Sequence, residues 1–560
     1  MNKIWDIKGE KIQGLSVVES ILHYKGITDK EEIEEFLSDK PKKTYNPFLM
    51  KNMKEAVDKI KYHIHNDNKI VIFGDYDVDG VTSSALLVEF FSNIIENIDY
   101  YIPNRFSEGY GLNKDAIKHI KEDMNADLII TVDNGISSFE EVNYAKEIGL
   151  DIIVTDHHNP PEKLPECIII NVKQDGDEYP FKELCGCGVA FKLAQALQRE
   201  LDLPRNTLSV PLDLVALGTI ADLVPLIDEN RTLVKYGLKR INSNKRLGIL
   251  SLRKEVGLDE KEISAGRIGY VLGPCFNAAG RIEDAKLGVK LLLEKNEEEA
   301  KKVAAMLHNL NSERQAIQEK GEEFARLLVE TNYMNYDFLV IRADGVSEGV
   351  IGIVAGRIKD VFYKPTLVVT KTEEGYIKGS GRSIKGINIY DELVNVSDLF
   401  LGFGGHEMAC GFSLEEDKLD ELREKLDKRA KEIKLYNPEI FVPKINIMTE
   451  LDADQLSVNL INEISKLEPY GMANPKPLFM IKDIQVNPSW TKGCGNNNVH
   501  LKFSGKKENT FLSGIGFSLA EKYDGLSNQN TVDVVFSPEI NEYNGKITPQ
   551  MVMEDIKESK

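Results

Sequence analysis

The feature that most constrains this chain is an apolar run that ends in three carboxylates. Residues 70–74 read Ile-Val-Ile-Phe-Gly, and Asp75, Asp77 and Asp79 follow at alternate positions. Such a run is typical of a buried parallel strand, and in open α/β sheets ligands bind just outside the carboxyl ends of the strands. Carboxylates about 4 Å apart repel one another by about 4 kcal/mol per pair at an effective dielectric constant of about 20. We therefore expect these aspartates to share a hard divalent cation.

A polar residue follows an apolar segment at three further places. They are Asp133 after residues 128–132, His157 after residues 152–155, and Asp222 after residues 214–221, the last segment being predicted as a helix. One strand-end aspartate often only caps the next helix, and a lone histidine is more often structural. Strands separated by helices form a parallel sheet, however, and their carboxyl ends meet at one edge. We therefore predict that five metal ligands converge there: Asp77, Asp79, Asp133, His157 and Asp222.

The types of ligand narrow both the metal and the reaction. Carboxylate-rich sites with one or two imidazoles suit manganese or magnesium rather than zinc or copper. Two such ions about 3.5–4 Å apart, bridged by a carboxylate, stabilise the attacking and leaving oxygens of a displacement at phosphorus. We therefore expect two manganese or magnesium ions and hydrolysis of a phosphate ester. Asp133 is expected to bridge the ions, Asp75 to support them directly or through another ligand, and His158 to stabilise charge on the phosphate.

Length and composition favour a cytoplasmic protein with several domains. At 560 residues and 42% apolar content, the chain is too long for one hydrophobic core. Its formal charge of −20 argues against a nonspecific polycation but allows a local basic groove. The six cysteines form no Cys-x-x-Cys pair, and no apolar stretch reaches the length of a secretion signal or a membrane span. We expect reduced thiols and no membrane contact.

Changes in composition predict five segments. These are a helical N-terminal cap at 1–65, a parallel-sheet α/β domain at 66–295, a connecting helix at 296–334, a smaller α/β domain at 335–435 and a β-barrel at 440–560. Apolar residues at helical spacing predict the connecting helix, and short strands between Gly and Asn clusters predict a barrel such as an OB-fold. In the barrel, Lys502, Lys506 and Lys507 are candidate nucleic-acid contacts and, equally, ordinary surface lysines.

Two other segments carry groups that suit a phosphate ligand. The segment 100–111 combines aromatic residues with Arg105, Tyr110 and turn glycines, which suits stacking on a base and pairing with a phosphate, or an ordinary loop. Gly404, Gly405 and His406 lie in a glycine-rich run at 401–412. Backbone N–H groups in such a run can approach an anion closely, and the same run can be a structural turn.

Together these motifs resemble those of the DHH phosphoesterase superfamily. The resemblance rests on Gly74-Asp75-Tyr76-Asp77-Val78-Asp79-Gly80, Val132-Asp133-Asn134-Gly135 and Asp156-His157-His158. Within that superfamily the whole chain resembles the RecJ family of bacterial 5′→3′ exonucleases specific for single-stranded DNA. The resemblance implies a DHH domain at 66–295, a DHHA1 domain at 335–435 and an OB-fold domain at 440–560. It also implies a role in DNA repair and recombination, with a RecQ-type helicase and a single-strand-binding protein as partners.

The resemblance also implies a set of substrate contacts. Arg281 matches a phosphate-contacting arginine, Ser380 and Arg382 match a phosphate-recognising strand end, and Gly404, Gly405 and His406 fall in a run similar to the GGGHxxAAG signature of DHHA1 domains. With Arg105, and with Tyr110 beside the first base, Arg281, Ser380 and Arg382 would hold a terminal 5′-phosphate. Four residues depart from the family pattern: Cys275, Ser347, Glu348 and Cys410.

Two other functions share these features with a single-strand exonuclease. A DHH-family phosphatase or nanoRNase acting on very short oligonucleotides or pAp would use the same metal ligands, but such enzymes are shorter and lack a barrel. A nonenzymatic DNA-binding replication accessory would keep the fold and lose the site. The complete set of predicted ligands argues against the accessory, and the last 120 residues argue against the phosphatase.

Overall fold

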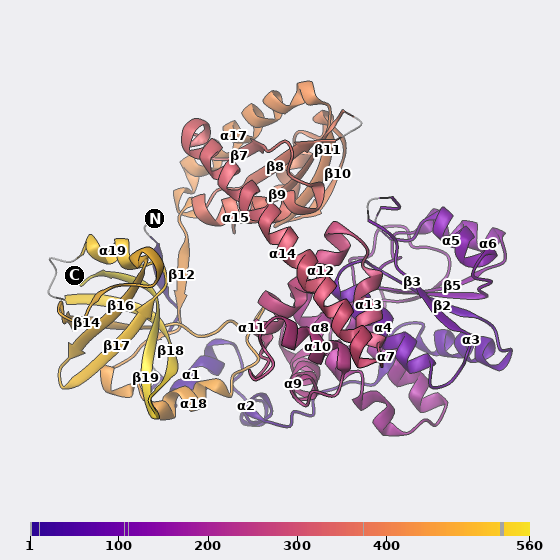
Figure 1. Cartoon of the computed structure of the whole chain (residues 1–560), viewed down its shortest axis with the longest axis horizontal. Coiled ribbons are helices and arrows are strands. Elements are labelled where there is room, and N and C mark those ends of the chain that lie inside the picture. Colours follow the sequence, from indigo (N-terminus) through magenta and orange to yellow (C-terminus); the bar gives the residue numbers. More distant parts are fainter. Residues whose placement is uncertain are drawn as a thin grey trace. The chain divides into compact units, whose positions relative to one another are not determined.

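The computed structural model describes residues 3–9, 12–105, 107–109, 111–372, 375–526 and 531–559. The chain folds into two compact units (Figure 1). The first contains residues 46–222 and 237–443, and the second contains residues 3–45, 223–236 and 444–560. Across the described residues, none of the helices has both the length and the apolar character that crossing a bilayer requires.

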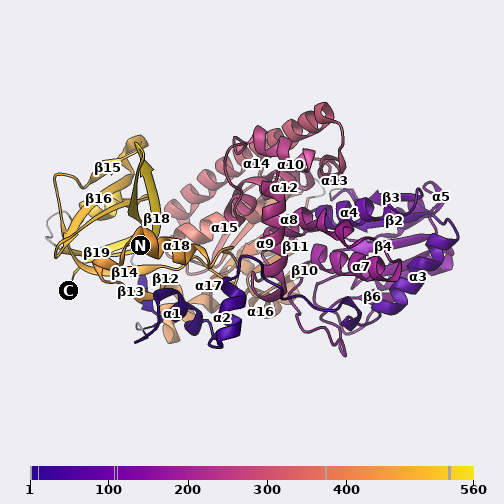
Figure 2. The same cartoon turned by 90° about the horizontal axis from the view of Figure 1, so that it is seen from below.

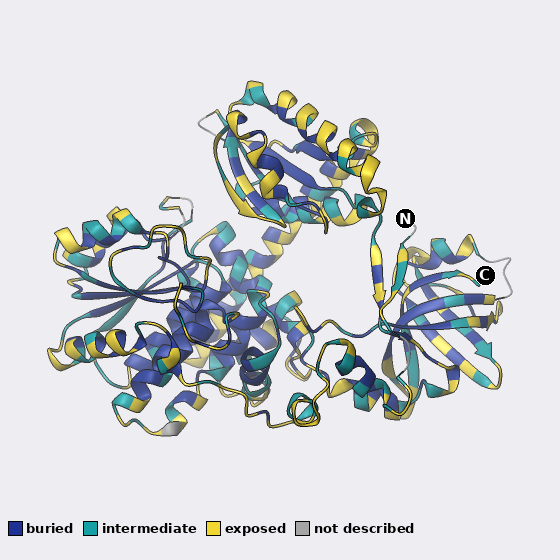
Figure 3. Cartoon of the chain, turned by 180° about the vertical axis from the view of Figure 1, so that it is seen from behind, coloured by how far each residue is buried: buried dark blue, intermediate teal, exposed yellow. Residues whose placement is uncertain are grey.

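The first unit contains a five-stranded parallel sheet, seen at the right of Figure 2. Its strands, in spatial order, are β3 (Ile98–Tyr101), β2 (Ile70–Gly74), β4 (Leu128–Val132), β5 (Asp151–Thr155) and β6 (Ile168–Ile170). Every residue of β2 and β4 is buried, as expected for strands covered on both faces (Figure 3). The predicted parallel-sheet α/β fold is therefore confirmed.

Helices cover both faces of this sheet. α5 (Lys114–Glu122) and α6 (Phe139–Glu147) pack on one face, against Val71, Phe73 and Ile129. α4 (Val78–Phe91) and α7 (Gly186–Glu200) pack on the other. The remaining helices before the second sheet are α3 (Met53–His65), α8 (Leu212–Ala221), α9 (Asp228–Asn242), α10 (Leu247–Glu255), α11 (Ala265–Arg267), α12 (Gly273–Ile282), α13 (Lys286–Leu293) and α14 (Glu297–Leu328).

The first unit also contains a second, mixed sheet. Its order is β10 (Phe400–His406), β11 (Ala409–Leu414), β9 (Ile377–Arg382), β8 (Thr366–Lys371) and β7 (Leu339–Arg342). Only the β7–β8 pair is parallel. Its helices are α15 (Glu348–Phe362), α16 (Ile389–Val394) and α17 (Leu419–Tyr436). α15 packs on β8 and β9, and α14 packs on α15, so α14 links the two sheets.

The second unit is a closed β-barrel with short flanking helices. The strands are β13 (Thr449–Glu450), β14 (Phe479–Val486), β18 (Thr531–Tyr543), β19 (Lys546–Glu558), β17 (Thr510–Gly516), β16 (His500–Lys507) and β15 (Lys492–Cys494). Pairing of β14 with β16 closes the sheet on itself around Phe479, Phe503 and Phe536. The flanking elements are α1 (Val17–Tyr24), α2 (Lys30–Leu37), α18 (Val458–Ser465), α19 (Ala520–Asp524) and the parallel pair β1 (Ile4–Ile7) and β12 (Lys444–Ile447). The predicted barrel is confirmed.

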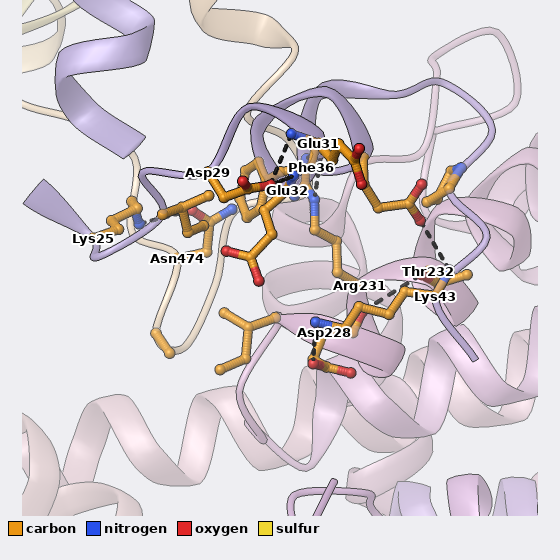
Figure 4. Close-up of a pocket in the computed structure, with 15 residues that line it drawn as sticks. Lys25, Asp29, Glu31, Glu32, Phe36, Lys43, Asp228, Arg231, Thr232 and Asn474 are labelled. Atoms are coloured by element: carbon orange, nitrogen blue, oxygen red, sulfur yellow. Dashed lines mark hydrogen bonds and ion pairs between the residues drawn. The ribbon is translucent and has the colours of Figure 1, made fainter. Parts of the chain in front are cut away.

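Arg231 joins three separate stretches of the second unit (Figure 4). Its guanidinium donates hydrogen bonds to the carbonyl oxygens of Phe36, Lys466 and Leu467 at 3.0, 3.1 and 2.9 Å, and it lies 3.8 Å from the centre of the Phe36 ring. Burial lowers the pKa of Arg231 to about 10. One buried cation therefore fixes residues near the start, middle and end of the chain to one another.

A buried ion-pair cluster joins helices of the first unit that carry candidate ligands. Arg246, just before α10, donates to both carboxylate oxygens of Asp213 in α8 at 2.8 and 3.0 Å, and to Glu89 in α4 at 2.7 Å. The side chains of Arg246 and Asp213 are only 7% and 2% exposed. Because Asp79 lies in α4 and Asp222 follows α8, this cluster fixes the helices that position both aspartates.

We predict that Arg246→Ala lowers the free energy of unfolding of the first unit by about 3–5 kcal/mol, because it leaves the buried carboxylate of Asp213 without its partner and removes the shorter of the two cation contacts of half-buried Glu89. Thermal and urea denaturation followed by circular dichroism measure the change. The matched control is Lys54→Ala, which removes a cation from an exposed ion pair with Asp58 and should leave stability nearly unchanged. Equal effects of the two substitutions would contradict the role of the cluster.

Candidate metal centre

The predicted ligands lie together at one edge of the parallel sheet. Asp75, Asp77 and Asp79 follow β2, Asp133 follows β4, and Asp222 directly follows α8; His157 follows β5. The turn after β2 is fixed because Asp77 caps α4: its Oδ1 accepts the N–H groups of Asp79 and Gly80 at 2.9 and 3.0 Å. One oxygen of Asp77 thus holds the helix and the other is left for a ligand.

The candidate ligand atoms form groups in which all atoms lie within 4.8 Å of one another. The groups are Asp75, Asp77 and Asp133; Asp79, His157 and Asp222; and Asp133, His157 and His158. His157 Nε2 lies 3.1 Å from Asp133 Oδ1 and 3.6 Å from Asp222 Oδ2. Asp133 therefore lies between two adjacent sites, one on the Asp75 side and one on the Asp222 side.

Burial and mutual repulsion raise the pKa values of the aspartates. Burial and then the charge of Asp77 raise the pKa of Asp79 to about 7, and burial and then the charge of Asp79 raise the pKa of Asp222 to about 9. Burial is also the main cause that raises the pKa of Asp133 well above its ordinary value, and the charges of the neighbouring aspartates raise it further. The carboxylates are thus held in an arrangement that favours protons, or cations, between them.

His157 is set up as a neutral ligand. Burial and the charge of His158 lower the pKa of His157 to about 3. Among the described residues, neither ring nitrogen of His157 has a hydrogen-bond partner, and the same is true of the buried atoms Asp75 Oδ1, Asp133 Oδ1 and Asp222 Oδ2. Such atoms are costly to bury without a partner. An oxygen-rich donor set with one neutral imidazole fits two hard divalent ions, manganese or magnesium.

Backbone groups at the start of α7 support Asp79. The N–H groups of Gly186 and Cys187 donate to its two carboxylate oxygens at 2.6 and 2.9 Å. A Cβ at Gly186 would lie 2.6 Å from Asp133 Cβ, and a Cβ at Gly218 would lie 2.7 Å from Asp79 Oδ1, so only glycine allows this packing. These supports were not predicted; the run Cys-Gly-Cys-Gly at 185–188, before a helical pattern, is the signal that could have indicated them.

Asp156 orients His158 and keeps it positively charged. The Asp156 Oδ1 atom lies 2.7 Å from His158 Nδ1, and Asp156 Oδ2 accepts the N–H of Ile136 at 2.9 Å. Burial disfavours the charged ring, but the hydrogen bond and charge of Asp156 outweigh it and raise the pKa of His158 to about 9. His158 therefore presents a cation beside the candidate metal ligands, as its predicted role requires.

Three of the predicted phosphate contacts meet at the first turn of α15. Arg281 Nη1 donates to the carbonyl oxygen of Gly349 at 2.9 Å, and Arg382 Nη1 lies 3.2 Å from Ser380 Oγ. A Cβ at Gly352 would lie 2.9 Å from Ser380 Oγ and 3.0 Å from Arg382 Nη2. The missing side chain at Gly352 thus lets the helix start lie directly against Ser380 and Arg382.

These arginines form part of a cluster of cations. Burial, followed by the charges of Arg105, Arg314 and Arg382, lowers the pKa of Arg281 to about 10. Arg105 also lies over the ring of Tyr76, 5.2 Å from its centre. Within the described ranges, no carboxylate lies within 4.0 Å of any of the four guanidinium groups. Arginines gathered without an anionic partner suit an anionic ligand.

Strand register places the glycine-rich run beside this cluster. Ser380 pairs with Gly411 and Gly411 with Gly404, while Arg382 pairs with Ala409 and Ala409 with His406. Directly opposed residues share a sheet face, so Gly404 and His406 lie on the same face as Ser380 and Arg382. Gly405 falls on the opposite face, where a Cβ would lie 2.4 Å from the carbonyl oxygen of Ala409.

The other sequence-predicted positions are placed as follows. Tyr110 lies outside the described residues. Cys275 is buried and its thiol donates to the carbonyl oxygen of Val271 at 3.3 Å. Ser347 caps α15, and Glu348 pairs with Lys378 at 2.8 Å. Three of the four departures from the family pattern thus make local contacts within the fold of this chain.

We predict that Mn²⁺ binding tightens as pH rises from 6 to 8, because Asp79 and Asp222 must lose protons before they coordinate a metal. Each proton released on binding should lower the dissociation constant for Mn²⁺ about tenfold per pH unit. Isothermal titration calorimetry in buffers of different ionisation enthalpy measures both quantities. An affinity independent of pH, with no proton release, would be inconsistent with the raised pKa values.

Three family models match the sequence. They are described as "DHH family, N-terminal domain" over residues 69–219, "DHHA1 domain" over residues 335–432 and "RecJ OB domain" over residues 447–555. All of the predicted metal ligands except Asp222 lie within the first match.

Individual relatives agree with these matches. The single-stranded-DNA-specific exonuclease RecJ of Bacillus subtilis is 40% identical over 548 residues, which cover 98% of this chain and 68% of the relative. The crystal structure of Thermus thermophilus RecJ in complex with Mn²⁺ has a TM-score of 0.83 and 27% identity, covering 100% of this chain and 80% of that one. The complex of the same protein with Mg²⁺ has a TM-score of 0.78 and 26% identity, covering 100% and 79%. The resemblance seen in the motifs is confirmed: this chain belongs to the RecJ family of single-stranded-DNA-specific exonucleases.

Proposed function

We propose that this protein is a metal-dependent exonuclease that hydrolyses single-stranded DNA from the 5′ end and releases nucleotides. The observation that carries the proposal is the pair of adjacent ligand groups around Asp133, whose buried oxygen and nitrogen atoms lack partners among the described residues. The names of the relatives support single-stranded DNA as the substrate, and their Mn²⁺ and Mg²⁺ complexes support these cofactors. The barrel favours this function over a short-oligonucleotide phosphatase.

Each part of the site has a task in this proposal. Two divalent ions, when bound, supply an activated water and positive charge for the scissile phosphate. Asp133 would hold both ions, with Asp75 and Asp77 as further ligands on one side and the group of Asp79, His157 and Asp222 on the other. His158, kept charged by Asp156, stabilises the negative charge that develops on the phosphate oxygens.

The arginine cluster provides end recognition. Arg105, Arg281 and Arg382 form a cationic group with Ser380. Burial is the main cause of the raised pKa of Asp75, and the charge of Arg105 opposes this rise, so Arg105 lies close to the metal centre. A terminal phosphate held by these residues would place the next phosphodiester at the metals. Charge-assisted contacts of this kind favour strands that enter with a phosphorylated 5′ end.

The barrel supplies a surface suited to the rest of the strand. Lys502 and Lys506 lie on the outer face of β16. In the strand register, Lys502 is opposite Lys492 of β15 and Lys506 is opposite Phe511 of β17. Phe511 is 81% exposed, and Lys506 Nζ lies 5.4 Å from its ring centre. Lysines interleaved with an exposed aromatic ring suit single-strand binding without sequence preference. Lys507 has the same strand alternation as the inward-facing Leu501 and Phe503, so it contributes less to this outer surface.

The family context supports the wider setting of this activity. We propose that the protein works in the cytoplasm, in DNA repair and recombination, with a RecQ-type helicase exposing single strands and a single-strand-binding protein covering them. In this proposal these partners supply the single-stranded substrate.

We predict that the protein with Mn²⁺ shortens 3′-labelled single strands progressively and releases the label of 5′-labelled strands at once. Asp133→Asn should lower kcat at least a hundredfold, about 2.7 kcal/mol. Asparagine is the sharpest replacement, because Asp133 has a φ of 63° and asparagine tolerates this left-handed conformation. Exposed Asp123→Asn is the control. Activity of Asp133→Asn within tenfold of the wild type, or degradation from the 3′ end, would refute the proposal.

We also predict that strands with a 5′-phosphate are cut with a kcat/KM about tenfold higher than strands with a 5′-hydroxyl, because the arginine cluster pairs with the terminal phosphate. Arg382→Ala should remove most of this preference. Arg342→Ala is the matched control, since Arg342 lies in the same sheet but pairs with Asp344 and Glu416. Equal rates on both strands in the wild type and in Arg382→Ala would eliminate the end pocket.

A further inference from the structure

Lys173 occupies a strand-end position at the metal edge of the parallel sheet. β2, β4 and β5 are each followed by candidate metal ligands, whereas β6 ends at Ile170 and is followed by a short turn that contains Lys173. β6 runs parallel to β5, so its carboxyl end lies at the same edge as His157 and His158. A lysine thus stands where the neighbouring strands present carboxylates and imidazoles.

Hydrogen bonds fix the turn with Lys173 to the loop with His158. The buried Asn171 side chain donates to the carbonyl oxygen of His158 at 2.8 Å and accepts the N–H of Lys173 at 2.8 Å. Gln174 Nε2 donates to the carbonyl oxygen of Ile169 at 3.0 Å and closes the turn. The backbone of Lys173 is therefore held in a defined position relative to His158.

The charge of Lys173 reaches the Asp222 side of the metal centre. Burial is the main cause of the pKa shifts of Asp222 and His157, and the ammonium of Lys173 contributes to both, favouring ionised Asp222 and neutral His157. In the part of the chain that the structure describes, no carboxylate lies within 4.0 Å of the Lys173 ammonium. Lys173 is half-buried, so its charge is kept near a metal centre without an ion pair to explain it.

We infer that Lys173 binds the DNA phosphate that follows the scissile one, between the second and third nucleotides. The inference rests on the proposed function. Arg105 follows β3, the first strand in the spatial order of the sheet, whereas Lys173 follows β6, the last strand, and the candidate ligands that follow β2, β4 and β5 lie between them. With the terminal phosphate at the arginines and the scissile phosphate at the metals, the strand reaches Lys173 with its next phosphate. Lys173 is then a substrate-binding residue that fixes the register of the strand.

The test combines a protein variant with a modified strand. We predict that Lys173→Ala lowers kcat/KM on a 5′-phosphorylated strand about tenfold to a hundredfold, the range of one charge-assisted hydrogen bond. A neutral methylphosphonate between the second and third nucleotides should lower kcat/KM of the wild type by a similar factor and cause little further loss in Lys173→Ala. Lys173→Arg should retain most of the activity.

Two controls separate this role from others. Lys114→Ala removes a lysine that pairs with Glu140 on the surface of the same domain, and should act like the wild type. Mn²⁺ affinity of Lys173→Ala, measured by calorimetry, should stay within about tenfold of the wild type, because loss of the lysine removes a repulsion of the metal but also makes Asp222 harder to ionise. Mn²⁺ affinity weakened more than tenfold would instead assign Lys173 to support of the metal centre and overturn the inference.

A binding measurement keeps the inference separable from the proposed function. Fluorescence anisotropy with Ca²⁺ in place of Mn²⁺ should show that Lys173→Ala binds the strand more weakly, with a slope of log K against log salt concentration lower by about 0.7, as for one lost phosphate contact. Failure of the wild type to cut single strands would refute the proposed function alone. Wild-type affinity and slope in Lys173→Ala, or a full methylphosphonate effect in that variant, would refute the role of Lys173.

Discussion

The repulsion among aspartates buried at one sheet edge is the constraint on which the first unit depends. Asp75, Asp79 and Asp133 are nearly inaccessible to water, and the pKa of Asp133 is raised first by burial and then by the charges of four neighbouring aspartates, Asp79, Asp77, Asp75 and Asp222. The fold offsets this with local dipoles rather than with ion pairs: the α4 cap at Asp77 and the start of α7 at Asp79 supply N–H groups. The remaining charge is left to be balanced by cations from solution, so metal binding should contribute directly to the stability of this unit.

The ligand set could be predicted from the sequence because the physics that arranges it is local. Apolar runs define β2, β4 and β5, and parallel pairing then brings the residues that follow them to one edge. Asp222 was predictable from the apolar segment that became α8. For the residues that follow the strands, the sequence pattern and the topology have the same consequence; Asp222 meets them only because α8 also packs against α4.

The glycine run at 185–188 could have indicated a close approach at the start of α7, but the carboxylates that the supports meet could not be predicted, because they depend on distant packing. Gly186 and Gly218 matter only because α7 and α8 pack against α4, and nothing in their own segments indicates which carboxylates they will meet. Lys173 reads as an ordinary loop lysine until β6 is paired with β5. Likewise, the place of residues 3–45 in the second unit follows from the pairing of β1 with β12, whose partners are more than 400 positions apart.

The 32-residue helix α14 has a mechanical consequence for the end pocket. It is a rod of about 48 Å that packs on α10 and α12 near its start and on α15 near its end, where Gly321 contacts Val346 and Val354. The arginine cluster takes Arg105 from the loop after β3, Arg281 from α12, Arg382 from β9 of the mixed sheet and Arg314 from α14 itself. Bending the rod would pull the cluster apart, and a phosphate held across the cluster would resist that bending. Occupancy of the pocket should therefore stiffen the molecule against forces that pull on the strand.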